Sequence, residues 1–311
     1  METFLHSVAS VTIILLLTAT GYFCAAKGWM NTQVKAFLGK FLLSFAVPCM
    51  CIYGLTSNLD RSMILQAGTA LVFLLCLDIV LVLLSWLCAK LLRLSRAQIG
   101  VFVMMCSLSN AIFVGYAMCS ELFGPACSAY VMLYYLVNTT FVQFIGGSLI
   151  RWGGSGEFGF SLRTVRRFLT TPAVLAVFVG FFLIITDIQL PSLAMNYMKY
   201  LNNTVTPMAL VLTGYIIYEI GLKNIRIDRT LTVMLLFRFV ISPALCLLGC
   251  SVFGITGLAR SVFVIESAMP VVTQTVVFAS EYGADEKLAA QGAALSTLAC
   301  FVVIPVLMQI L

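Results

Sequence analysis

Apolar runs of about 20 residues recur along the whole chain, and each is long enough to cross the hydrocarbon core of a bilayer, which is about 30 Å thick. The 311 residues are 61% hydrophobic and only 10% charged, unlike a soluble domain. Lipid offers the backbone no hydrogen-bond partner, and the runs lack the strict alternation of a membrane barrel, so we expect helices. The sequence therefore predicts an all-α, polytopic membrane protein.

We place about ten spans, which leaves little chain for a soluble domain. They are Phe4–Ala26, Phe37–Leu55, Met63–Ala89, Ile99–Leu122, Ala126–Ile150, Pro172–Ile188, Met195–Tyr218, Leu231–Phe253, Leu258–Ala279 and Leu288–Leu311. No Lys or Arg precedes the first span, and it is longer than the apolar core of a signal peptide. We therefore expect it to be retained as a membrane helix.

Lys and Arg gather in alternate connections between these spans. The rich connections hold Lys27, Lys35, Lys40, Lys90, Arg93, Arg96, Arg151, Arg163, Arg166, Arg167, Lys223, Arg226, Arg229 and Lys287. The other connections hold only Arg61, Lys199 and Arg260. By the positive-inside rule the rich side is cytoplasmic, so we expect both termini on the outer side of the plasma (inner) membrane. The net charge of +6 is thus a topology signal, and we expect no nucleic-acid partner.

The chain lacks the residue patterns of metal sites and enzymes. Its 11 cysteines lie almost entirely within the spans, and its one histidine is His6, so we expect neither a disulfide framework nor a metal site. A nucleotide-binding loop of the G-x-x-x-x-G-K type is absent, as are an H-E-x-x-H motif and a Ser–His dyad. We therefore expect no cofactor and no enzymatic activity.

Polar, helix-breaking residues interrupt two of the spans. The fourth span contains Ser107-Leu108-Ser109-Asn110, and the ninth contains Met269-Pro270-Val271-Val272-Thr273-Gln274. Two discontinuous helices at corresponding places in two halves indicate a substrate site near the midplane of the bilayer. Carriage of a solute across the membrane is therefore the leading hypothesis.

The longest polar connection divides the chain into two sets of about five spans. We expect a first five-helix repeat at 1–150, a cytoplasmic linker at 151–171 and a second repeat at 172–311. Because five is odd, the second half begins on the opposite side, so the repeat is inverted. Three pairs of residues recur at nearly constant separation: Pro48 with Pro207, Asp78 with Arg238, and Glu121 with Glu281.

Several motifs resemble those of the auxin efflux carrier family. Gly21-Tyr22-Phe23-Cys24-Ala25-Ala26-Lys27-Gly28, followed by Phe45-Ala46-Val47-Pro48, is similar to its amino-terminal pattern. Asn110–Tyr116 resembles its first broken-helix motif, and Glu266–Pro270, leading to Ala279–Gly283, resembles the second. Ala117 replaces the usual proline, Gln274 replaces an asparagine, and the long cytoplasmic loop of many plant members is absent. The resemblance covers essentially the whole chain and points to a short-loop, bacterial-type member.

The resemblance implies ten transmembrane helices in a five-plus-five inverted repeat, as in sodium/proton antiporters and bile-acid symporters, with the fourth and ninth helices crossing as broken helices. It implies that helices 1, 2, 6 and 7 form a scaffold that makes a homodimer. Helices 3–5 and 8–10 form a transport domain that moves by elevator-type alternating access. It also implies that Asn138, in the fifth span, lines the cavity.

The two breaks define the predicted substrate site. The half-helices that begin after Asn110 and Thr273 point the partial positive charge of their N-termini at the membrane centre, which favours a carboxylate. The site that we predict consists of Ser107, Ser109, Asn110, Gly115, Asn138, Met269, Pro270, Thr273 and Gln274. The alternative is that these polar residues only cap the broken ends and hold helices together.

Three ionisable residues within the spans are candidates for coupling or gating. Asp78 and Arg238 would be tolerated as a buried ion pair, with a charge that moves during the cycle as the alternative. Glu266 lies one turn before the second break, where it either carries a proton for coupled transport or faces water near the outer end. Pro48 and Pro207 are expected to kink scaffold helices beside the cavity, with pure packing as the alternative.

These observations favour a secondary active transporter for a small organic anion such as a carboxylate. Two alternatives stay open. One is a cation–proton antiporter, and the other is a membrane sensor that binds the same class of ligand without flux.

Overall fold

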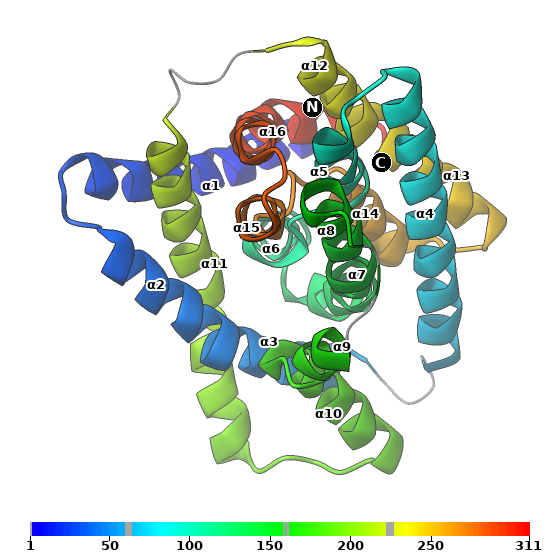
Figure 1. Cartoon of the computed structure of the whole chain (residues 1–311). Helices are drawn as coiled ribbons and strands as arrows, with labels where there is room; N and C mark the ends of the chain where they lie inside the picture. The colour runs from blue at the N-terminus through cyan, green and yellow to red at the C-terminus, as the bar shows by residue number, and fades with distance from the viewer. Residues whose placement is uncertain (1, 60–63, 158, 160–161, 222–226) are drawn as a thin grey trace.

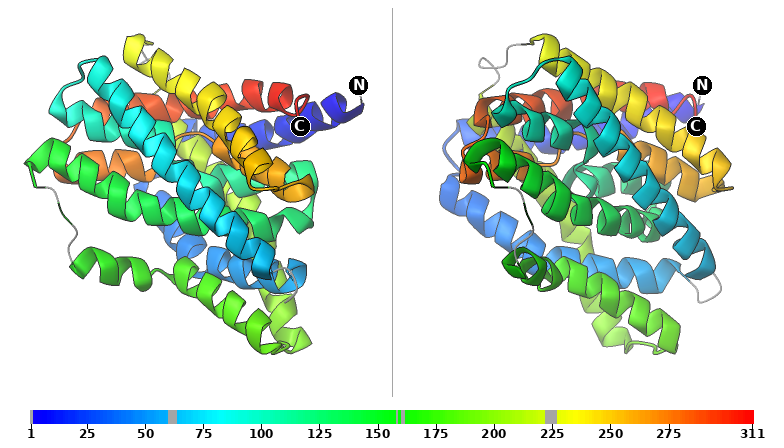
Figure 2. Two further views of the ribbon diagram at one scale, coloured as in Figure 1. Left: turned by 90° about the vertical axis from the view of Figure 1, so that its right-hand side faces the viewer. Right: turned by 45° about the vertical axis from the view of Figure 1, so that its right-hand side comes forward.

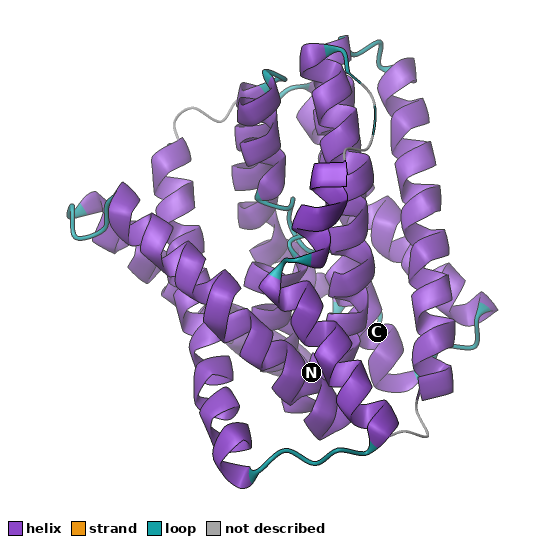
Figure 3. Cartoon of the chain, turned by 60° about the horizontal axis from the view of Figure 1, so that its bottom comes forward, coloured by secondary structure: helices purple, strands orange, loops and turns teal. Residues whose placement is uncertain are grey.

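The computed structural model describes residues 2–59, 64–157, 159, 162–221 and 227–311, and within them the chain is helical and forms no strand (Figures 1 and 3). Parts of the charge and span predictions lie outside the described residues: Arg61, Met63, Lys223 and Arg226. All 11 cysteines are free in the structure.

In the first half, the helices are α1 (Glu2–Ala26), α2 (Thr32–Phe41), η1 (Leu42–Ala46), α3 (Val47–Asn58), α4 (Ile64–Leu91), α5 (Arg96–Ser107), η3 (Ala111–Tyr116), α6 (Ala117–Phe123), η4 (Pro125–Cys127), α7 (Ser128–Phe141), η5 (Val142–Gly146) and α8 (Gly147–Ser155). They are followed by α9 (Leu162–Leu169), α10 (Pro172–Thr186), α11 (Ser192–Ile220), α12 (Arg229–Leu236), η7 (Phe237–Ile241), α13 (Ser242–Val252), α14 (Gly257–Ser267), α15 (Gln274–Tyr282) and α16 (Glu286–Leu307). The elements η1, η3, η5 and η7 are π-helical.

Six helical stretches of the described chain are long and apolar enough to cross a membrane, judged by length and composition. They are Ser7–Ala26, Thr32–Asn58, Ala67–Leu91, Pro125–Ser155, Arg229–Val252 and Glu286–Leu307. Arg96–Ser107, Ala111–Phe123 and Pro172–Thr186 are shorter apolar helices. Many large apolar side chains on these helices are exposed, among them Leu16, Leu83 and Val302. Such a surface is stable when lipid covers it.

The helices form two packed groups (Figure 1). In one group, α1 packs along α11, and α3 packs against both α10 and α11. In the other, α4 packs on α5 and α7, α8 packs on α5 and α15, and α13 packs on α14. The groups meet where α3 contacts α7 and where α1 contacts α6 and α16. The N- and C-terminal ends lie close together in both views of Figure 2.

Both predicted interruptions are present, and both lie in the second group. The helix α5 ends at Ser107 and η3 begins at Ala111, while α14 ends at Ser267 and α15 begins at Gln274. Asn110 caps the new helix in the first break, since its side-chain oxygen accepts a hydrogen bond from the Phe113 N–H at 3.3 Å. Polar residues in the sequence thus mark the helix ends, because their side chains bond the backbone N–H groups that have no partner within the helix.

Prolines accompany irregular turns in the longer helices. Pro48 is the second residue of α3, directly after the π-helical η1, and Pro243 has the same place in α13 after η7. A π turn shifts the hydrogen-bond register beside a residue that has no N–H to donate. Pro207 lies inside α11, which continues through it.

The close packing of α1 on α11 depends on two glycines. A Cβ atom added to Gly21 would lie 2.0 Å from the Val211 carbonyl oxygen, and one added to Gly214 would lie 2.0 Å from the Thr18 carbonyl oxygen. Neither backbone can yield without separating the helices.

Gly21→Ala is therefore expected to destabilise the protein by roughly 1–3 kcal/mol, the usual cost of overpacking. The matched control is Gly39→Ala on α2, where an added Cβ meets nothing within 4 Å. Thermal unfolding of the purified variants in detergent should show a lower midpoint than wild type for Gly21→Ala. The midpoint of Gly39→Ala should not be lowered. Equal midpoints would contradict the close approach.

Candidate functional site

The two breaks lie against each other and pair through their backbones. Ser109 and Val271 form an isolated antiparallel bridge, and the Asn110 N–H donates a 2.9 Å hydrogen bond to the Pro270 carbonyl oxygen. The side-chain amide of Asn110 also donates to the Thr273 hydroxyl at 3.4 Å. The four half-helices are therefore joined at one crossing point.

The side chain of Asn138 serves as a backbone partner for the first break. Its oxygen accepts from the Ser109 N–H at 3.0 Å, and its amide nitrogen donates to the Ser109 carbonyl at 2.8 Å. Asn138 is only 3% exposed. The Ser109 hydroxyl donates in turn to the Tyr134 hydroxyl at 3.2 Å, so α7 holds this segment through two side chains.

Arg238 connects the carbonyl-bearing ends of the two breaks. Its Nε donates to the Met269 carbonyl at 2.7 Å, and its Nη1 donates to the Cys106 carbonyl at 2.9 Å. The residue is fully buried and comes from the π turn η7. C-terminal helix ends carry partial negative charge, and a guanidinium offers several donors in a fixed plane. Arg238 therefore balances the partial negative charge at the carbonyl ends of α5 and α14, which N–H groups at the crossing do not reach.

Hydroxyl groups serve two further backbone groups of the second break. The Val271 N–H donates to the Ser296 hydroxyl of α16 at 3.0 Å, and the Ser242 hydroxyl of α13 donates to the Ser267 carbonyl at 3.0 Å. The Met269 N–H donates to the Glu266 carbonyl at 3.1 Å. These contacts supply the partners that lipid cannot.

The structure replaces the predicted direct pairing of Asp78 and Arg238 by these carbonyl contacts. In the described part of the chain, the ion pair within 4.0 Å is Lys35–Glu219, and Asp78 and Arg238 are not that close. They still interact electrostatically over a longer distance. The physical reason is that unpaired carbonyls at two helix ends compete for the guanidinium and lie nearer to it.

A cavity of about 200 Å³ opens at the crossing. Its lining residues are Leu43, Ser109, Asn110, Ala111, Ile112, Phe113, Tyr135, Asn138, Thr139, Val142, Val272, Thr273, Gln274 and Val277. The first turns of η3 and α15 both contribute to this lining, and first-turn N–H groups have no acceptor within their own helix. The cavity therefore receives the positive ends of two helices.

Five of the predicted substrate residues line this cavity, and four do not. The lining residues are Ser109, Asn110, Asn138, Thr273 and Gln274. Of the other four, Ser107 donates to its own helix at Val103, Met269 and Pro270 accept the bonds described above, and Gly115 lies against Glu266. Neither Pro48 nor Pro207 lies in the lining.

The chemistry of the lining suits a small anion with an apolar part. None of the lining residues carries a charge, so the positive potential comes from helix ends and neutral donors. Within the described chain, the Gln274 side chain has no hydrogen bond of its own, which leaves its amide free for a ligand. Tyr135, Val142 and Val277 supply apolar surface around these groups.

Much of the apolar lining was not predicted from the sequence. Tyr135 and Val142 lie three residues before and four residues after Asn138, so helical periodicity would have placed them on the same face. Periodicity could not have identified Leu43 as a lining residue, because Leu43 comes from η1 in the other helix group.

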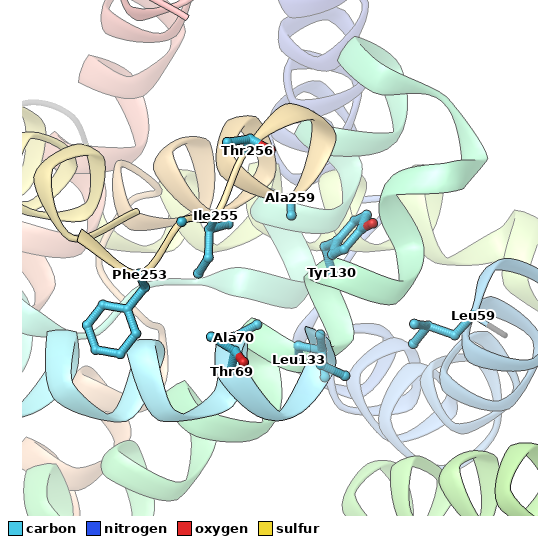
Figure 4. Close-up of a pocket in the computed structure, with 11 residues that line it drawn as sticks. Leu59, Thr69, Ala70, Tyr130, Leu133, Phe253, Ile255, Thr256 and Ala259 are labelled. Atoms are coloured by element: carbon cyan, nitrogen blue, oxygen red, sulfur yellow. The ribbon is translucent and has the colours of Figure 1, made fainter. Parts of the chain in front are cut away.

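A larger cavity of about 300 Å³ lies apart from the breaks (Figure 4). In the view of Figure 4, Ile255 and Ala259 lie across from Thr69 and Ala70 of α4, and Leu133 of α7 lies beside Thr69 and Ala70. Among the described residues, its lining includes none from either interruption and none that carries a charge. The crossing is therefore the candidate functional site.

Comparison with known proteins identifies relatives over almost the whole chain. Residues 6–158 and 160–308 match the family described as membrane transport protein. A protein of Methanocaldococcus jannaschii, described as an uncharacterized transporter, is 26% identical over 302 residues, which cover 94% of this chain and 95% of that protein.

Replacing Arg238 by Ala or Lys is expected to destabilise the crossing, because each orphaned carbonyl costs about 1–3 kcal/mol. Lysine has a charge but lacks the planar fork that reaches both oxygens. Unfolding of the purified protein in detergent measures the loss, with Arg229→Ala at the exposed start of α12 as the control. The double variant Asp78→Asn, Arg238→Ala should be no more stable than Arg238→Ala alone. Full rescue would show that the charge of Asp78, rather than the two carbonyls, is the main partner.

Proposed function

The chain belongs to the membrane transport protein family, that of the auxin efflux carriers, and on this premise we propose that it carries a small organic anion across the plasma membrane. It is a multi-pass membrane transporter and not an enzyme. The proposed activity is secondary active transport of a carboxylate, with the cavity at the crossing as the substrate site.

One observation carries the choice of an anion. The N-terminal ends of η3 and α15 meet at one cavity, and none of its described lining residues is acidic. Each end carries a partial positive charge of roughly half an elementary charge, and its effect is stronger away from water. A carboxylate can bind there without a buried lysine, whereas a cation would be repelled.

The proposed architecture is ten spans in two inverted repeats, 1–150 and 172–311, joined by the linker 151–171. The place of the two breaks supports it, as does the place of Asp78 and Arg238 on corresponding helices. Both termini would then lie outside the cell.

The two packed groups provide the parts for elevator-type movement. We assign α1, α2, η1, α3, α10 and α11 to the scaffold, which would form the homodimer, and the group that contains both breaks to the transport domain. The cavity lies between them, since Leu43 is the contribution of the first group and the other lining residues belong to the second. Sliding of the second group would carry the polar lining with it.

Flux into liposomes tests this function. Purified protein is reconstituted, and uptake of labelled small carboxylic acids is compared with that of their uncharged amides, which match them in size. We expect acids, but not amides, to be transported and to raise the thermal unfolding midpoint. Stabilisation without flux would favour a sensor, and exchange of Na⁺ for protons without any acid would favour an antiporter. Either outcome would overturn the proposal.

Gln274→Ala should weaken acid binding about 10- to 100-fold, as expected for loss of one hydrogen bond to a charged group. Because the Gln274 amide has no partner among the described residues, the unfolding midpoint without ligand should not change. Asn138→Ala should lower both the affinity for the acid and the unfolding midpoint, since it also removes the partner of Ser109. Gln33→Ala, exposed at the start of α2, is the control. Equal behaviour of the Gln274 and Asn138 variants would contradict this division of roles.

A further inference from the structure

Glu266 is a fully buried acid in the last turn of α14, beside the second break. Its Oε1 accepts a weak hydrogen bond from the Cys119 thiol of α6 at 3.6 Å. Its Oε2 is buried and has no partner in the described chain. The cavity residues and the contacts of the crossing make no use of this carboxyl group.

The carboxyl group lies directly on the backbone of Gly115. A Cβ atom at position 115 would be 2.3 Å from Oε2 and 2.6 Å from Oε1, so the contact requires a glycine. Gly115 belongs to η3, about one turn after Ala111, where that helix begins at the cavity. Glu266 therefore joins the outer half-helices of the two broken spans and lies close to the substrate site.

Within the described chain, no positively charged group is among the interaction partners of Glu266. The titratable groups that interact with it are Cys119 on α6, Cys127 in η4 and Tyr134 on α7. Gly115 on η3 contributes only backbone, and Cys246 on α13 adjoins Ser267 instead. An unpaired charge is strongly unfavourable in such a place, so the observed arrangement suits the neutral acid.

We propose that Glu266 binds the coupling proton and that the substrate anion is carried together with it. This inference rests on the proposed function, since it names the ion coupled to transport at the same site. One proton from water on one side binds the Glu266 carboxylate at Oε2. It is released to the other side when movement of the half-helices exposes the carboxylate.

Electrostatic linkage gives the direction of the coupling. A charged Glu266 would repel a carboxylate at the start of η3, and protonation removes that repulsion. Binding of the proton therefore favours binding of the anion, and by reciprocity the anion favours the proton. Proton and anion accordingly move in the same direction.

Two assays on the same liposomes separate coupling from carriage. In the first, labelled acid exchanges for unlabelled acid at equal pH on both sides. In the second, net uptake is driven by a pH gradient, acidic outside. Wild type should perform both, and acidification outside should increase net uptake about tenfold per pH unit while the gradient lasts. Glu266→Gln should keep exchange and lose the response to the gradient.

Glu281→Gln is the matched control, because Glu281 is an exposed acid at the other end of the same broken span. It should behave as wild type. If no acid exchanges, the proposed function fails. If wild type exchanges acid but net uptake ignores the gradient, follows Na⁺ instead or increases with acid inside, the proposed function stands and proton symport is wrong.

Cys119→Ser provides a second variant in case Glu266→Gln does not fold. A hydroxyl donates a stronger hydrogen bond than a thiol and stabilises the charged carboxylate. The midpoint of the pH profile of net uptake should therefore move to lower pH, while exchange at acidic pH is kept. An unchanged profile, with exchange intact, would contradict a role for Glu266 as the proton site.

Discussion

The need to satisfy backbone groups inside a bilayer governs the centre of this molecule. Each interrupted helix leaves N–H and C=O groups that an intact helix would pair, and hydrocarbon offers no substitute. The two interruptions solve part of the problem together, because the Asn110 N–H bonds the Pro270 carbonyl. Side chains from three other helices supply most of the remainder: Asn138, Arg238 and Ser296. The fold around the crossing is thus arranged to bring these side chains to one place.

This arrangement also separates the two kinds of helix end. The carbonyl ends face a buried guanidinium, whereas the N–H ends of η3 and α15 face a cavity. With the carbonyl ends already neutralised, the potential in the cavity stays positive even though no lining residue is charged. The proposed anion would therefore bind without a charged side chain in the described lining.

The sequence predicted the helical class and both interruptions, because lipid-spanning runs and polar breaks are local signals. It also placed Asn110 and Gln274 near one another through the expected inverted repeat, and they line the same cavity. It failed for Arg238, whose partners are carbonyls of Cys106 and Met269, since backbone groups leave no trace in a sequence. Gly115 was expected at the substrate, but its missing Cβ makes room for Glu266. Such long-range steric relations appear only when the chain is folded.

Among the described lining residues, Leu43 alone belongs to the other helix group, and in the proposed movement it would stay behind while the others move. When the groups slide as proposed, the donors that recognise the anion keep their geometry while a different side chain takes the place of Leu43. Compounds that reach Leu43 would then trap a single conformer. An inhibitor would accordingly select one conformer through its contact with Leu43, while the part that mimics the acid stays the same.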